Sequence, residues 1–138
     1  MKYVEVSRRI DAPIETVWSI LTDKKKLVDG GFGITRLDGE IEEGAKLKLW
    51  AEVADRPITL KVARWSAPSR MVWRGGMPFG LFRGERSFML ESVSGATEFT
   101  LREEFSGPML ALIWRSMPDL QPSFDKFAGA LKQHSESP

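Results

Sequence analysis

The chain has 138 residues, of which 42% are hydrophobic and 28% charged, and its formal net charge at pH 7 is +1. This size and composition are typical of one small globular domain, so we expect a single domain over residues 1–138. Such a balanced charge gives no electrostatic footprint for nucleic acid or for a generic anionic membrane surface. The absence of cysteine excludes disulfides, thiolate nucleophiles and cysteine-based metal sites. No apolar run approaches the ~18 residues of a membrane span, so we expect a soluble, cytoplasmic protein without a membrane span.

The N-terminal segment predicts a strand followed by two short helices. Residues Tyr3–Ile10 alternate in polarity and contain several β-formers, which indicates a strand. Pro13 then marks a helix start, and Asp23 is a suitable cap for a second helix that ends near Leu27. The first helix has an apolar stripe at helical spacing, formed by Ile14, Val17, Trp18 and Leu21.

From residue 46 the hydrophobic period changes to two, which predicts antiparallel strands. Lys46–Ala54 alternates charged and apolar side chains, Asp55–Pro57 turns the chain, and Ile58 continues the apolar face on the return. If the turn is this tight, the pairs are Val53 with Ile58, Ala51 with Leu60, and Leu49 with Val62.

The clearest hairpin joins residues 82–93 to residues 96–105. A two-residue Ser94-Gly95 turn between two alternating segments predicts a tight hairpin, which pairs Phe88 with Leu101. The strands of this hairpin therefore have a defined register, and the apolar face of each can be assigned from parity.

The same register places Arg86 directly opposite Glu103, on the apolar face of the hairpin. A buried charge is costly unless it is paired, so we expect these two side chains to meet. The pair has two interpretations: a structural ion pair that holds two strands in register, which we favour, or a polar group that orients an otherwise apolar ligand.

The C-terminal segment predicts a long amphipathic helix that begins near Asp119. Its apolar positions are Leu120, Phe124, Phe127 and Leu131. One helix cannot cover a flat sheet of this size, so we expect the sheet to curl and to leave room for a ligand. The predicted fold is α+β of the helix-grip type: a curved antiparallel sheet of about seven strands around a long C-terminal helix, with two short helices after the first strand.

Three segments, in this order, resemble the SRPBCC superfamily. They are Ile10-Asp11-Ala12-Pro13 with Val17-Trp18 and Leu21-Thr22-Asp23; Gly84–Leu90 with Thr97–Gly107; and the closing helix with Phe124, Phe127 and Leu131-Lys132. The resemblance spans essentially the whole chain. It implies a helix-grip fold shared with START lipid-transfer domains, birch-pollen-allergen-type proteins and polyketide cyclase/dehydrase-like proteins. It does not imply one function, because the superfamily also contains hydratases and chaperone activators.

Candidate ligand-binding residues come from parity on the predicted strands, from the apolar stripe of the final helix and from the apolar stretch before that helix. The polar candidates are Arg86 and Glu103. The apolar candidates are Trp73, Phe82, Phe88, Leu101, Phe105 and Phe124, together with Trp114 and Met117 as a lid or as core.

Catalytic groups are sparse. The only histidine, His134, lies near the C-terminus, and no catalytic triad or metal-ligand cluster can be assembled. We therefore expect a protein without cofactor or metal that binds a small hydrophobic molecule such as a lipid, an isoprenoid or a polyketide-like compound. One alternative is a polyketide cyclase/dehydrase-like enzyme that uses Glu103 as acid or base.

A second alternative is a protein-interaction module of the chaperone-activator type. Parity places Trp50 and Trp65 on the polar face of the sheet, where an exposed tryptophan suggests a covered surface. The same face could instead form a homodimer, or lysine and arginine stems could shield the two rings.

Overall fold

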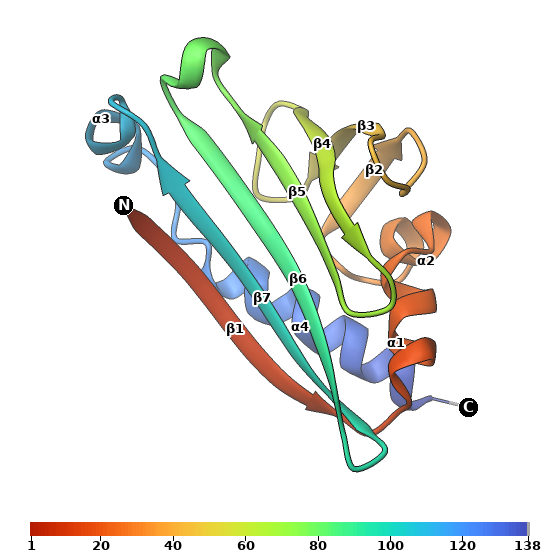
Figure 1. Ribbon diagram of the computed structural model, residues 1–138. Coiled ribbons are helices and arrows are strands. Elements are labelled where there is room, and N and C mark those ends of the chain that lie inside the picture. The colour runs from red at the N-terminus through yellow and green to blue at the C-terminus, as the bar shows by residue number, and fades with distance from the viewer. Residues whose placement is uncertain (138) are drawn as a thin grey trace.

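The computed structural model describes residues 1–137 and shows one curved antiparallel sheet with a long helix across its concave face (Figure 1). The strands are β1 (Lys2–Ile10), β2 (Ile34–Asp38), β3 (Lys46–Ala51), β4 (Ile58–Ser66), β5 (Arg70–Gly76), β6 (Arg83–Val93) and β7 (Ala96–Ser106), in the sheet order β1-β7-β6-β5-β4-β3-β2. The helices are α1 (Ile14–Leu21), α2 (Lys24–Asp29), α3 (Leu110–Trp114) and α4 (Gln121–Glu136), with a 3-10 turn η1 (Pro78–Gly80). The predicted α+β helix-grip fold is confirmed. Within residues 1–137, no helix is long and apolar enough to cross a membrane.

The two short helices begin where the sequence predicts. α1 follows Pro13 and buries Val17, Trp18 and Leu21. α2 is capped by Asp23, whose Oδ1 accepts a hydrogen bond from the Lys26 amide at 3.2 Å. These two helices follow the C-terminal end of β1 and lie together at that end of the curved sheet (Figure 1).

The β6–β7 hairpin has the predicted register. Phe88 lies opposite Leu101, and Arg86 lies opposite Glu103. The turn residues have positive φ angles, 52° at Ser94 and 83° at Gly95, as a two-residue hairpin turn of the I′ type requires.

The β3–β4 pairing differs from the prediction. Leu49 pairs with Ile58 and not with Val62. The loop at residues 52–57 is longer than the predicted turn, and it leaves Val53 52% and Ile58 42% exposed. The shift is an even number of residues, so the predicted faces are right although the predicted register is wrong.

A β-bulge in β4 also corrects the prediction for one tryptophan. The pairing of β4 with β5 shifts between Val62 and Arg64, which leaves Ala63 as the extra residue. An extra residue turns every following side chain to the opposite face. Trp65 therefore packs against the core, with its ring edge-on to Trp18 at a centroid distance of 5.2 Å, and Arg64 is exposed.

The predicted surface shared by Trp50 and Trp65 is therefore absent. Only Trp50 keeps its outward position, where the guanidinium of Arg36 lies 4.6 Å and the ammonium of Lys48 lies 5.4 Å from its ring centroid. These contacts match the shielding interpretation. The homodimer surface and the chaperone-activator-type surface, both built on this tryptophan pair, lose their basis.

α4 is attached to the edge strand β1 by side-chain bonds along its length. These are the ion pair Arg8–Asp125 at 3.3 Å, Gln121 Nε2 to the Glu5 carbonyl at 3.3 Å, and Lys132 Nζ to the Arg9 carbonyl at 2.7 Å. Below them, Phe124, Phe127 and Leu131 are buried against the sheet. The helix and β1 are thus joined both by apolar packing and by polar contacts.

On the other side of α4, attachment is concentrated near its C-terminus. His134 Nε2 lies 2.8 Å from the Gly30 carbonyl oxygen, and the Phe32 ring packs edge-on to Phe127 at 5.0 Å. Between these contacts and the start of the helix, α4 stands away from β3 and β4, and this separation positions the cavity described next.

Candidate functional site

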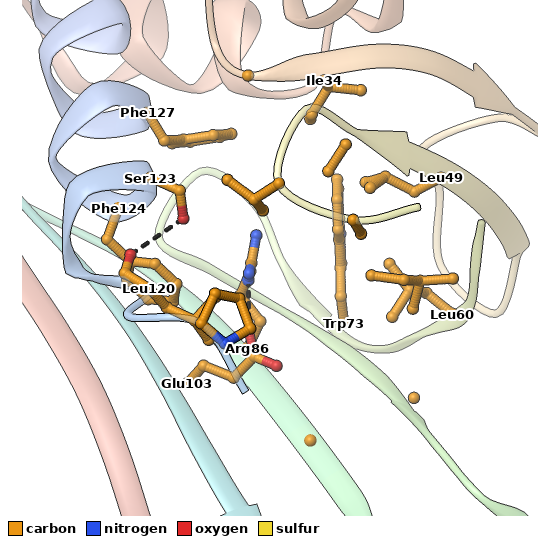
Figure 2. A pocket seen from close by; sticks show the side chains of 18 of the residues that line it. Ile34, Leu49, Leu60, Trp73, Arg86, Glu103, Leu120, Ser123, Phe124 and Phe127 are labelled. Atoms are coloured by element: carbon orange, nitrogen blue, oxygen red, sulfur yellow. Dashed lines mark hydrogen bonds and ion pairs between the residues drawn. The ribbon is translucent and has the colours of Figure 1, made fainter. Parts of the chain in front are cut away.

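A cavity of about 560 Å³ lies between the concave face of the sheet and the N-terminal half of α4. This volume is within the roughly 300–1,000 Å³ that is usual for small-molecule sites. Figure 2 shows Leu120, the residue before α4, and Phe124 and Phe127 of α4 facing Trp73, Leu49 and Leu60 of the sheet across this space. The wall is mainly apolar, and its larger side chains are Ile34, Leu49, Leu60, Trp73, Phe82, Leu101, Phe105, Leu120, Phe124 and Phe127.

Two neighbouring glycines form the floor of the cavity. Gly75 of β5 pairs with Gly84 of β6, so no side chain rises from the sheet at this point. A Cβ atom at Gly84 would lie 2.8 Å from Glu103 Oε2, and one at Gly75 would lie 2.9 Å from the Thr59 carbonyl oxygen. The two glycines therefore give the cavity its depth at this position.

An ion pair crosses the floor beside the glycines. Arg86 Nε donates a hydrogen bond to Glu103 Oε1 at 2.7 Å, and the Arg86 guanidinium lies 4.8 Å from the ring centroid of Phe124. The Arg86 side chain is 27% exposed and the Glu103 side chain is 16% exposed. Within residues 1–137, each of these two side chains forms its hydrogen bond only with the other. The remaining guanidinium nitrogens and the second carboxylate oxygen can therefore serve a ligand or water.

A second ion pair stands at the mouth of the cavity. Lys126 Nζ of α4 contacts Glu52 Oε1 in the loop that follows β3, and both side chains are about half exposed, 47% and 51%. Both residues line the cavity. This pair bridges the sheet and the helix at the surface, whereas Arg86 and Glu103 lie deeper.

The family of the chain follows from comparison with known sequences. The model of the family described as "Polyketide cyclase / dehydrase and lipid transport" matches residues 1–136. The chain belongs to this family. The match confirms the resemblance to the SRPBCC superfamily that the sequence segments carry. No curated protein matches the sequence significantly.

Solved structures show that other members of this fold resemble the chain over its whole length. ZhuI aromatase/cyclase from Streptomyces sp. R1128 has 17% identity and a TM-score of 0.72, covering 98% of this chain and 93% of its own. A protein of Mesorhizobium loti has 17% identity and a TM-score of 0.75, covering 96% of each chain. The di-domain ARO/CYC BexL of the BE-7585A biosynthetic pathway has 14% identity and a TM-score of 0.73, covering 99% of this chain and 50% of its own. At these identities, the likeness shows a common fold.

The cavity of this family member brings together most of the side chains that the sequence predicted for the site. Those on its wall are Trp73, Phe82, Arg86, Leu101, Glu103, Phe105, Met117 and Phe124. Their role in ligand binding stays a prediction, because the structure gives their position and not an occupant.

Two predicted site residues do not line the cavity. Phe88 is fully buried, with its ring 4.7 Å from that of Trp73, which separates it from the open space. Trp114 of α3 packs against Phe105 at a centroid distance of 5.5 Å and forms no part of the wall. Each of the two packs against an aromatic side chain that does line the cavity.

Sequence reasoning missed several wall residues. Ile34 belongs to β2, whose short and irregular pattern gave no strand prediction, and Ser123 and Lys126 lie on the side of α4 next to its apolar stripe. The glycine floor could have been found, because Gly75 and Gly84 share parity with the inward residues Trp73 and Arg86. Within residues 1–137, no group of three or more histidine, aspartate or glutamate side chains is placed to hold a metal ion.

Proposed function

We propose that this member of the polyketide cyclase / dehydrase and lipid transport family binds a small, mainly apolar molecule in the cavity between the sheet and α4. A single observation carries the proposal: an apolar cavity of about 560 Å³ that contains one ion pair on its floor. Shape and apolar contact provide the affinity, and the ion pair orients the ligand. Lipids, isoprenoids and polyketide-like compounds all have this combination of an apolar body and a few oxygen atoms.

The ion pair suits an orienting role because it is held in place before any ligand binds. The Glu103 carboxylate fixes one edge of the Arg86 guanidinium, and the Phe124 ring covers the group from the helix side. Donors that are already fixed lose little conformational entropy when a ligand binds. A carbonyl, carboxylate or hydroxyl group of the ligand would therefore be placed against the guanidinium, with the apolar body over the glycine floor.

Blocking the cavity tests this proposal. Ser123→Trp places a large ring at the wall, and Gln133→Trp adds the same ring to the exposed face of the same helix as a control. Native mass spectrometry of the purified protein is expected to show a bound small molecule in wild type and in Gln133→Trp, but not in Ser123→Trp. In a titration with the fluorescent probe 1-anilinonaphthalene-8-sulfonate, wild type and Gln133→Trp should bind the probe with similar affinity, and Ser123→Trp should bind it much more weakly. Equal binding by folded Ser123→Trp and wild type would place the ligand elsewhere.

A cyclase/dehydrase-type reaction is the second candidate function, and the position of Glu103 favours it. Its Oε1 is occupied by Arg86, while its Oε2 lies next to the glycine floor, within reach of a bound molecule. The two similar structures from aromatase/cyclase proteins are consistent with this candidate. Glu103→Gln keeps the shape of the side chain, so it should abolish turnover of a poly-β-ketone substrate analogue while the analogue still binds. If wild type binds the analogue but does not turn it over, and Glu103→Gln binds it more weakly, only the ligand-binding function remains. A cytoplasmic location stays a prediction.

A further inference from the structure

Phe79 is the most exposed large apolar side chain of the described residues. It lies at the tip of the η1 turn between β5 and β6, is 99% exposed, and has φ 62° and ψ 21°. A bulky residue in the left-handed region is strained, and a fully hydrated phenylalanine ring adds nothing to packing. The turn thus holds an aromatic ring in solvent at a conformational cost, which points to a role outside the fold.

Other apolar side chains surround this tip. Met77 and Leu81 in the same turn are 40% and 37% exposed, and Leu112 of α3 is 65% exposed. The Met109 amide donates a hydrogen bond to the Leu81 carbonyl at 3.0 Å, which joins the η1 turn to the start of α3. Figure 1 shows both segments at the same end of the molecule. We refer to Met77, Phe79, Leu81 and Leu112 as the apolar tip.

Three cationic side chains lie next to the segments that carry the apolar tip. Arg83 follows the η1 turn, Arg115 follows α3, and Lys2 places its ammonium 5.9 Å from the ring centroid of Trp114 in α3. Within residues 1–137 none of these three forms an ion pair, whereas Arg74 on β5 is paired with Glu85. The rim of the tip therefore has a local positive charge that the net charge of the chain does not show.

The apolar tip also borders the cavity. Gly76 and Phe82, which flank the η1 turn, both line the cavity, and so does Met117, three residues after the end of α3. A surface that covered the tip would therefore lie beside one wall of the cavity.

We propose that the apolar tip docks on an anionic lipid bilayer, with Phe79 and Leu112 inserted at the level of the headgroups and with Arg83, Arg115 and Lys2 against the lipid phosphates. Apolar side chains exposed on the η1 turn and on α3 suit insertion into a fluid interface, and the unpaired cations complement anionic headgroups. A rigid protein partner would require a matching pocket for each projecting side chain. This docking goes beyond the proposed ligand binding and does not depend on it.

Vesicle co-sedimentation tests the proposal on the full chain. Wild type is expected to sediment with vesicles of phosphatidylcholine and phosphatidylserine, and much less with vesicles of phosphatidylcholine alone. Phe79→Gly combined with Leu112→Ser should weaken the apparent affinity roughly tenfold, because two apolar side chains leave the interface. Arg83→Glu should remove the preference for the anionic vesicles. Val93→Ser is the matched control: Val93 is 41% exposed at the opposite end of β6, and its loss should change nothing.

The apolar variants are suited to the test because the side chains that they remove are exposed, so we expect the fold to stay intact. Phe79 contributes no burial, and glycine adopts its φ angle without strain, so Phe79→Gly should keep or raise the melting temperature. Failure of wild type to sediment with anionic vesicles would overturn the proposal, and so would unchanged binding by the double variant. Sedimentation velocity provides a further check: a homodimer that Phe79→Gly dissociates would assign the tip to self-association and would also overturn it.

Discussion

Arg86 and Glu103 face each other across β6 and β7, with Arg86 Nε 2.7 Å from Glu103 Oε1, one row from the glycine floor of the cavity. The two residues share a wall that is otherwise mainly apolar. Each side chain satisfies the charge of the other, so they should act as a unit in unfolding experiments.

Removing both members of this pair should destabilise the protein by less than the two single removals added together. We expect Arg86→Leu and Glu103→Leu each to lower the free energy of unfolding by about 1–3 kcal/mol, because each leaves a charge unpaired beside apolar groups. The double variant should lose clearly less than the sum of these two values. Urea unfolding of the four proteins measures the coupling, and additive losses would show that the pair is not energetically linked.

The two floor glycines should differ in their tolerance of alanine. At Gly84 the new methyl group meets the movable end of Glu103, whereas at Gly75 it meets the Thr59 carbonyl oxygen and Leu60 Cδ2, the latter at 2.8 Å. We expect Gly84→Ala to fold and to bind an apolar ligand more weakly. Gly75→Ala should lower the melting temperature further, because backbone must shift. Thermal unfolding and probe titration on both variants give the order, and equal melting temperatures would contradict it.

At Gly129, unlike at the two floor glycines, an added methyl group should stabilise the protein. Gly129 lies on the exposed face of α4, where an added Cβ would contact nothing within 4 Å. Gly129→Ala should therefore raise the free energy of unfolding by about 0.5–1 kcal/mol, since alanine is the better helix former. A decrease in urea unfolding would mean that this part of α4 has a neighbour that the structure does not contain.

The bulge in β4 makes Trp50 of β3 and Trp65 of β4 energetically different. Trp65 packs edge-on against Trp18, so Trp65→Ala should cost about 2–3 kcal/mol through the cavity that it leaves. Trp50 faces outward, where Arg36 and Lys48 lie against its ring, so Trp50→Ala should cost about 1 kcal/mol or less. Denaturant unfolding distinguishes this result from the two similar losses that an unbulged strand would produce.

Glu136 should contribute stability that depends on pH. The Asp11 amide donates to its Oε2 at 2.8 Å and Lys132 Nζ lies 2.6 Å away, and together they lower the pKa of Glu136 below its ordinary value. A lowered pKa in the folded state means that the contribution is present above the ordinary glutamate pKa and is lost as the pH falls through the folded value. The stability difference between wild type and Glu136→Gln, measured by urea unfolding, should therefore be full at neutral pH and vanish in acid. A difference that grows in acid would contradict this assignment.

Local rules predicted the parts of the fold that have a defined turn. The Ser94-Gly95 turn fixes the register of β6 and β7, and so the sequence alone could place Arg86 beside Glu103. Alternation also assigned the correct face to β3 and the start of β4, because a shift by an even number of residues preserves parity.

The errors arose where alternation carries no information. A period of two cannot show how many residues form the 52–57 loop, and it cannot reveal the extra residue at Ala63 that turns Trp65 inward. In the site, parity found which side chains point inward, but not which are covered by another ring, as Phe88 is by Trp73. Such coverage depends on packing between elements that are distant in the sequence.

The uneven attachment of α4 has a mechanical consequence. Side-chain bonds to β1 are distributed along the whole helix, so α4 and β1 should move as one rigid unit. Strands β2, β3 and β4 form the other side of the cavity. Near its C-terminus, α4 contacts the segment before β2 through His134 and the Gly30 carbonyl oxygen. Near its N-terminus, within residues 1–137, the ion pair of Lys126 with Glu52 joins α4 to the loop after β3. We therefore expect a molecule larger than the resting cavity to be accommodated by movement of β3 and β4, while α4 keeps its place beside β1. Amide protons of residues 52–57 should exchange earliest, and those of α4 should stay protected.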